Sequence, residues 1–167
     1  NGETIESVLN RAIGELTGEE IHVMGSSRTD AGVHACGNVA VFDTEARMAA
    51  DKFSYALNQR LPEDIRIQDS CEVPADFHPR FQKTVKTYEY RILNREFPLP
   101  AYRFNSHFTY RKLDVERMRQ AAAYLIGEHD FQSFCAAGAQ VKTTVRTIYA
   151  LDVEKQGDLI ILRITGN

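Results

Sequence analysis

The sequence predicts an α+β fold in which helices pack on one face of a largely antiparallel sheet. Three observations lead to this prediction. Apolar residues recur at helical spacing over residues 5–16. Side chains of residues 83–93 are arranged so that alternate positions share one face, as in a strand. Residues 145–153 and 159–165 are typical of two strands that form a hairpin around Gln156-Gly157-Asp158.

The first helix and the two strands after it are marked by their end signals. Thr4 is suited to cap the helix, and Gly18 to end it. Residues 21–24 predict a strand, and residues 39–42 predict a second one. The stretch between them, 25–37, is rich in Gly, Ser and Asp, which predicts a loop.

The remaining elements follow the same reasoning. Residues 49–60 predict a helix that Leu61-Pro62 ends, and the alternation of Ile65 and Ile67 with charged residues predicts a half-exposed strand. Asp114 is suited to cap a helix that closes at Gly127. The predicted order is helix, strand, strand, helix, strand, strand, and then helix, strand, strand.

Composition narrows the classes of protein. The three cysteines and five histidines show no zinc-finger spacing, so no metal site and no disulfide framework is predicted, and a reducing cytoplasm is the expected location. No apolar run approaches the roughly 20 residues of a membrane span. No cofactor is indicated.

Charge is distributed unevenly along the chain. Residues 1–76 hold 14 acidic and 6 basic residues, whereas residues 77–167 hold 9 acidic and 14 basic residues. The stretch 78–112 alone has eight Lys and Arg against two Glu. This stretch is either a solvated strand face or a strip that faces phosphates.

The most informative motif is Ser27-Arg28-Thr29-Asp30-Ala31-Gly32-Val33-His34-Ala35. It places Arg28 and Asp30 two residues apart in the predicted loop. In an arbitrary loop such a pair would serve a structural turn. This string, however, closely resembles the Arg-Thr-Asp-Ala-Gly-Val-His motif around the catalytic Asp of the tRNA pseudouridine synthase A family, of the bacterial type.

Further segments resemble the same family, in the same order along the chain. They are Asn38-Val39-Ala40-Val41-Phe42-Asp43-Thr44, Phe77-His78-Pro79-Arg80-Phe81, Lys86-Thr87-Tyr88-Glu89-Tyr90, Gly127-Glu128-His129-Asp130-Phe131 and Val145-Arg146-Thr147-Ile148. The resemblance implies a pseudouridine synthase fold. It further implies that uridine is isomerised in the anticodon arm of tRNA, at positions 38–40, by a homodimer without a cofactor.

The resemblance assigns roles to three residues. Asp30 is the expected catalytic carboxylate, acting as a nucleophile at ribose C1′ or as a base at C2′. Arg28 is expected to orient Asp30 and to hold the flipped nucleotide. Tyr88 is expected to stack on the target base, although a half-buried tyrosine of a strand is the ordinary alternative. Five further residues are expected RNA contacts, each on weaker grounds: His78, Arg80, Lys83, Lys86 and Arg146.

We expect residues 1–167 to be one catalytic domain that is truncated at both ends, with 1–110 as a first half and 111–167 as the start of a second. The family pattern has a strand before Asn1, and after Asn167 an apolar segment with an active-site Arg. A non-catalytic RNA-binding module is the alternative. Asp30 argues against that alternative, because a carboxylate near phosphates repels RNA.

Overall fold

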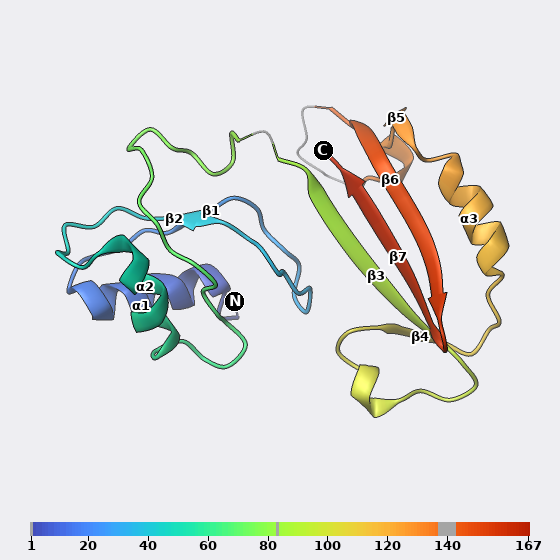
Figure 1. Ribbon diagram of the computed structural model, residues 1–167, viewed down its shortest axis with the longest axis horizontal. Helices are drawn as coiled ribbons and strands as arrows, with labels where there is room; N and C mark the ends of the chain where they lie inside the picture. The colour runs from blue at the N-terminus through green and yellow to red at the C-terminus, as the bar shows by residue number, and fades with distance from the viewer. Residues whose placement is uncertain (1, 83, 137–142) are drawn as a thin grey trace. The chain divides into compact units, whose positions relative to one another are not determined.

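The computed structural model describes residues 2–82, 84–136 and 143–167, which fall into two compact units (Figure 1). Unit 1 is Asn1–Gln82 and unit 2 is Lys83–Asn167. The boundary between the units therefore lies at 82/83, whereas the sequence placed its division at 110/111. That the two units work as one catalytic domain stays a prediction.

Helix α1 (Ile5–Thr17) of unit 1 forms as predicted, with both of its ends capped. The backbone N–H of Ser7 donates to Thr4 Oγ1 over 3.1 Å, and the N–H of Thr4 donates to Ser7 Oγ over 3.0 Å. This reciprocal pair satisfies two N–H groups that the first turn leaves open. Gly18 ends the helix with a left-handed φ of 77°, which glycine adopts without steric cost.

The core of unit 1 lies between α1, the short helix α2 (Phe53–Asn58) and extended segments of the chain. A 3-10 turn, η1 (Ala50–Lys52), precedes α2, so the predicted helix 49–60 is shorter and irregular. The ring centroids of Phe42 and Phe53 lie 5.5 Å apart in an edge-to-face contact. The buried residues of this core are Val8, Leu9, Ala12, Ile13, Ile21, Val23, Phe53, Leu57 and Leu61.

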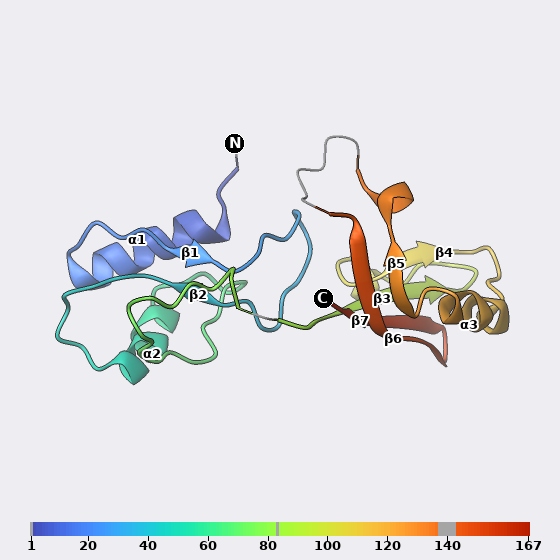
Figure 2. The ribbon, with the colours of Figure 1, turned by 90° about the horizontal axis from the view of Figure 1, so that it is seen from above.

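Among the described residues of unit 1, regular strand pairing is confined to β1 (Met24–Gly25) and β2 (Ala40–Val41), which are antiparallel (Figure 2). The strands predicted at 21–24 and 39–42 are thus in the right place but pair over only two residues each. Ile21 and Val23 are buried while His22 and Met24 are exposed, as a strand requires. The N–H of Val23 donates to Asn10 Oδ1 over 2.7 Å, so a side chain takes the place of a strand neighbour.

The prediction of a strand at Ile65 and Ile67 is wrong: within the described residues these two belong to no strand. Their side chains do pack against the core of unit 1. The backbone of Ile67 is held by the side chain of Asn58, which accepts its N–H and donates to its carbonyl, both over 2.8 Å. An amide side chain therefore satisfies the groups that a strand neighbour would have satisfied.

Unit 2 contains one sheet of five strands in the order β4-β3-β7-β6-β5. The strands are β3 (Lys86–Asn94), β4 (His107–Thr109), β5 (Gly127–Asp130), β6 (Val145–Gln156) and β7 (Leu159–Gly166). The β3–β7, β7–β6 and β6–β5 pairs are antiparallel and the β3–β4 pair is parallel, which confirms the α+β class with a largely antiparallel sheet. The sequence did not predict β4 or β5, because segments of three and four residues carry too little alternation. The described residues of unit 2 also form two 3-10 turns, η2 (Pro100–Tyr102) and η3 (Gln132–Phe134).

Helix α3 (Val115–Ala123) packs on one face of this sheet (Figure 1). Asp114 caps it as predicted, with Oδ1 accepting the N–H groups of Glu116 and Arg117 over 3.1 Å each. The helix ends before the predicted Gly127, because Gly127 is already the first residue of β5. Buried residues of this second core are Ala122, Val153 and Ile160. In the described part of the chain, every helix is too short or too polar to cross a membrane.

Candidate functional site

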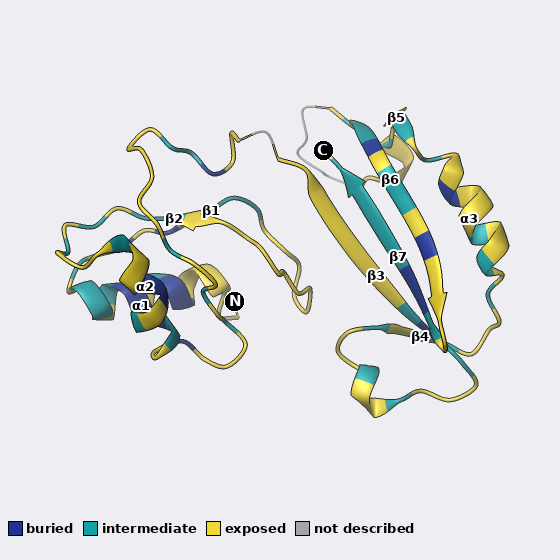
Figure 3. Cartoon of the chain, viewed as in Figure 1, coloured by how far each residue is buried: buried dark blue, intermediate teal, exposed yellow. Residues whose placement is uncertain are grey.

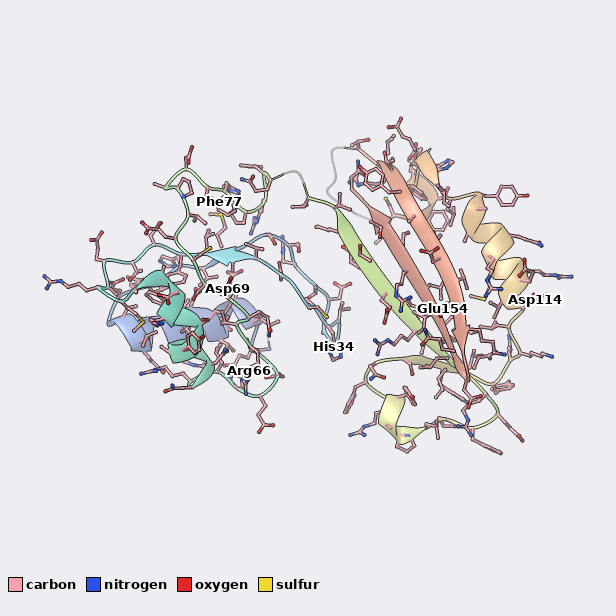
Figure 4. The ribbon with its side chains drawn as sticks, in the orientation of Figure 1. His34, Arg66, Asp69, Phe77, Asp114 and Glu154 are labelled. Carbon is pink, nitrogen blue, oxygen red and sulfur yellow. The ribbon has the colours of Figure 1, made fainter. Side chains whose placement is uncertain are left out.

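The predicted catalytic motif forms an exposed loop that leaves β1 and returns to β2 (Figure 4 labels His34 on it). At its far end the N–H of Val33 donates to the carbonyl of Asp30 over 3.1 Å, which closes a four-residue turn. Gly32 occupies the third position of the turn with a φ of 82°. A type II turn requires that conformation and favours glycine there. The motif therefore presents Asp30 at the first position of a tight turn, with its side chain exposed.

Arg28 lies on the same loop and is also exposed. Among the described residues, the ion pairs do not include one between Arg28 and Asp30. The structure thus places these two predicted residues on one loop without joining their side chains. The orienting role of Arg28 stays a prediction.

Asn38 closes the neck of this loop, and the sequence analysis gave it no role of its own. Its Oδ1 accepts the N–H of Val39 over 3.0 Å and the hydroxyl of Ser26 over 2.7 Å. Its Nδ2 donates to the carbonyl of Ser27 over 3.1 Å. One amide side chain therefore joins the outgoing and returning arms of the loop.

His78 and Arg80, two of the predicted RNA contacts, lie in the last segment of unit 1. The guanidinium Nε of Arg80 donates to the carbonyl of Gly25 over 3.0 Å, at the point where the loop that carries Asp30 leaves β1. His78 Nδ1 accepts the N–H of Arg80 over 3.2 Å, and its ring stacks on Phe81 with centroids 4.0 Å apart. The structure therefore connects Arg80 to the base of the loop across 55 positions of sequence.

Three other predicted residues meet at one end of the sheet of unit 2. In the strand register, Lys86 of β3 lies opposite Gly166 of β7, which lies opposite Ile148 of β6. Directly opposed residues share a face, as do residues two apart on a strand. Lys86, Tyr88 and Arg146 therefore lie on the same face at the same end of the sheet.

In the described part of the chain, Lys86 and Tyr88 are exposed at this end of the face, which we call the open end, whereas α3 covers the other end. The helix packs against Ile160, with Ile92 beside it, toward the far end of β3. Tyr88 is 58% exposed, and it lies opposite Ile164 of β7. The burial colouring of β3 shows most of this strand as exposed (Figure 3). An uncovered tyrosine beside an isoleucine offers a flat apolar surface on which a nucleobase can stack.

Arg146 is partly buried and bends back over the start of its own strand. Its guanidinium donates to the carbonyls of Thr143 and Val145 over 2.9 and 2.7 Å. These two bonds use part of the five N–H donors of an arginine. Lys83, the remaining predicted contact, lies outside the described residues.

The opposite face of the same sheet carries a network of ion pairs that the sequence analysis missed. Glu89 accepts from Arg91 over 2.6 Å and from Arg163 over 2.7 Å, and Arg163 also reaches Glu154, labelled in Figure 4, over 3.3 Å. Hydrogen bonds from Arg91 and then Arg163 lower the pKa of Glu89 below its usual value. Glu89 and Arg163 lie directly opposite each other in the register of β3 and β7, so their ion pair could be predicted only once the pairing of these two strands was known. A hollow of about 480 Å³ in unit 2 borders this network and contains none of the predicted site residues.

A metal site is not indicated in the described ranges, because no three His, Cys, Asp or Glu side chains there gather as ligands. The groups that the structure does present are an exposed carboxylate on a tight turn in unit 1, and an exposed aromatic with cations in unit 2. The first is suited to nucleophilic or base chemistry, and the second to holding a base and its phosphates.

Comparison with known proteins agrees with these features. The sequence profile described as tRNA pseudouridine synthase matches residues 1–82 and 121–167. A protein of Acetivibrio thermocellus named tRNA pseudouridine synthase A is 44% identical over 167 residues, which is 100% of this chain and 68% of that protein. A protein of the same name from Thermoanaerobacter is 45% identical over 168 residues, covering 100% of this chain and 68% of the relative. A third, from Brevibacillus brevis, is 46% identical over 165 residues, covering 98% of this chain and 67% of the relative.

Both the profile and the relatives extend over the Asp30 loop and over the strands β6 and β7. The profile match reaches into both units and includes Asp30 and Arg146, while the alignment with the Acetivibrio relative, which covers 100% of this chain, also spans Lys86 and Tyr88. The chain therefore belongs to the tRNA pseudouridine synthase family.

Proposed function

We propose that this chain catalyses the isomerisation of uridine to pseudouridine in tRNA, with Asp30 as the essential carboxylate. The observation that carries the proposal is the exposed Asp30–Val33 turn, closed by a 3.1 Å hydrogen bond, in a chain of this family. The turn presents the Asp30 side chain to solvent on an arm of the protein, where a flipped nucleotide can reach it.

The reaction breaks the bond between ribose C1′ and uracil N1 and forms a bond from C1′ to C5. The proton on C5 is lost and N1 gains one, so the reaction is redox-neutral. Asp30 initiates it either by attacking C1′, which gives a covalent ester, or by removing the C2′ proton, which gives a glycal. In both routes the same carboxylate is regenerated when the base rejoins.

Tyr88 holds the detached base by stacking while the ring turns to present C5. Its exposed ring and the apolar neighbour Ile164 support this role. Arg28 holds the flipped nucleotide from the loop side. Lys86 and Arg146 at the open end of the sheet, together with His78, contact phosphates.

The proposed substrate is the anticodon arm of tRNA, with uridines 38–40 as the targets, and the proposed active form is a cytoplasmic homodimer. The names of the relatives support tRNA as the substrate. Membership of a family of synthases favours an enzyme over an RNA-binding module without activity. The turn that presents a carboxylate also favours the enzyme, because such a group weakens phosphate binding.

The test is Asp30→Asn in the full-length protein, assayed on tRNA transcripts by mapping pseudouridine. We expect loss of turnover by at least about a thousandfold, with tRNA affinity within a few-fold of the wild type. The substitution keeps the shape of the side chain and removes its charge and nucleophilicity.

Asp43→Asn is the matched control, since Asp43 is an exposed aspartate in the same unit that lies beyond β2. It should leave turnover unchanged. Turnover by Asp30→Asn near the wild-type rate, with deamidation excluded by mass spectrometry, would disprove the assignment.

A further inference from the structure

We propose that Asn38 is a positioning residue that fixes the catalytic loop through its neck, and that Arg80 fixes the base of the same loop. The inference rests on the proposed role of Asp30. Its direct evidence is the set of side-chain bonds that begins where the strand pairing of β1 and β2 ends.

Backbone pairing between the two arms of the loop stops early. The last ladder pair is Gly25↔Ala40, and one further bond, from the N–H of Ser26 to the carbonyl of Val39, spans 2.8 Å. Beyond that bond the Asn38 side chain continues the connection, by donating to the carbonyl of Ser27 over 3.1 Å. Ser27 is only three positions before Asp30, so this contact lies close to the carboxylate along the chain.

The orientation of the Asn38 amide is determined by its partners. The N–H of Val39 can only donate, so the atom that it meets at 3.0 Å is the amide oxygen. The same oxygen accepts the hydroxyl of Ser26 over 2.7 Å, which leaves the nitrogen to face the carbonyl of Ser27. An amide side chain supplies this acceptor and donor together, whereas a carboxylate supplies only the acceptor.

Arg80 secures the other side of the neck. Its Nε donates to the carbonyl of Gly25, whose own strand partner is Ala40. Its backbone N–H is in turn held by His78 Nδ1. This geometry assigns Arg80 to the loop, and it competes with the earlier prediction that Arg80 serves as a phosphate contact.

A positioning role has a kinetic signature. A loosened neck lets Asp30 sample unproductive positions after the nucleotide is bound, and a displacement of about 1 Å can cost roughly a hundredfold in rate. The loss should therefore appear in kcat, while KM and the overall stability change little, because Asn38 and Arg80 are both exposed.

The experiment compares Asn38→Ala, Asn38→Asp and Arg80→Ala with the wild-type full-length protein. We expect Asn38→Ala to lower kcat at least about tenfold with KM within about twofold. Asn38→Asp keeps the acceptor and loses the donor, so its kcat should lie between that of the wild type and that of Asn38→Ala. Arg80→Ala should lower kcat without changing the salt dependence of tRNA binding, and Arg60→Ala, which removes an exposed arginine bonded to the carbonyl of Ala56, is its control.

Hydrogen exchange at the Val33 amide supplies a readout that does not depend on activity. That amide closes the Asp30 turn, so it should exchange several-fold faster in Asn38→Ala than in the wild type. Wild-type kcat and unchanged Val33 exchange in Asn38→Ala would overturn the role of Asn38. If Arg80→Ala has a normal kcat but a weaker salt dependence of tRNA binding, Arg80 is a phosphate contact and its role in the loop is overturned. If the wild type is inactive but Val33 exchanges faster in Asn38→Ala, the proposed function is refuted while the role of Asn38 in holding the loop is supported.

Discussion

The two units hold their functional residues by different means. In unit 2 the ladder between β3 and β7 runs without interruption from Lys86 to Leu93, and backbone bonds fix where Lys86 and Tyr88 lie. In unit 1 the ladder between β1 and β2 has two residue pairs, and side chains of Asn38 and Arg80 hold the loop that carries Asp30. The proposed binding residues thus depend on strand spacing, and the proposed catalytic residue depends on individual side chains.

This difference makes opposite demands on the sequence of each unit. The sheet of unit 2 tolerates changes in outward side chains but not an increase in backbone separation. The loop of unit 1 tolerates a small added side chain that points into open space, but not the loss of the hydrogen bonds from Asn38 or Arg80. Three further predictions test this contrast.

The largest expected effect concerns Gly166, which lies opposite Ile148 of β6 at the end of β7. A Cβ at Gly166 would lie 2.8 Å from the carbonyl oxygen of Thr147, beside the register shift between Ile148 and Ala150. Gly166→Ala should therefore force the strands apart and lower the free energy of unfolding by about 1–3 kcal/mol. Chemical denaturation followed by circular dichroism measures the change.

Gly37→Ala is the matched control in the loop of unit 1, since no atom lies within 4 Å of a Cβ there. It should change the free energy of unfolding by less than about 0.5 kcal/mol. Equal destabilisation by the two substitutions would contradict the contrast between a close-packed sheet and an open loop.

The second prediction concerns the cations at the open end of the sheet. If Lys86 and Arg146 each neutralise one phosphate, Lys86→Gln and Arg146→Gln should each reduce the slope of log affinity against log salt by roughly 0.7–0.9. Filter binding to a tRNA transcript at several salt concentrations measures this slope. Lys155→Gln serves as the control, because Lys155 lies opposite Ile160 at the other end of the sheet and should leave the slope unchanged. A slope that stays constant in all three variants would place the RNA elsewhere.

The smallest expected effect concerns Glu89 on the opposite face of the sheet. Hydrogen bonds from Arg91 and Arg163 lower the pKa of Glu89 in the folded state, so its ionised form stabilises the fold. That contribution is present above the pKa of a glutamate in the unfolded chain, about 4.3. It is lost as the pH falls through the lower pKa of Glu89 in the folded state. Glu89→Gln should therefore lose less stability on acidification than the wild type does.

Thermal melts between about pH 6 and pH 3 measure this difference. It should shrink at about 1 M salt, because the pairs are near the surface and ions screen them. An identical acid dependence of the two proteins would show that the Glu89 network contributes nothing to the stability of the sheet.

The elements that could be predicted from the sequence are those whose signals are local. Thr4 and Asp114 cap the helices that they were expected to cap, and the turn at residues 156–158 joins β6 to β7. These signals lie within a few residues of the structure that they produce, so no distant contact alters them. The strand predicted at Ile65 and Ile67 failed for the opposite reason, because Asn58 is a partner that alternation cannot reveal.

The candidate site divides in the same way. The string around Asp30 identified the expected carboxylate and its loop, and Gly32 supplied the turn, because both depend on residues adjacent in the chain. Whether Asp30 acts as nucleophile or base stays open, as does the role of Arg28.

The sequence by itself determined the α+β class, the family and the residue expected to react, since each is written in a contiguous motif or a short period. Only the tertiary structure decided that Lys86, Tyr88 and Arg146 share one end of a sheet face, that Arg80 reaches back 55 positions to Gly25, and that Glu89 is paired with Arg163. The physical reason is that strand register and side-chain bonds between distant segments depend on which segments meet. A linear pattern specifies what each segment can form, and the folded chain selects its neighbour.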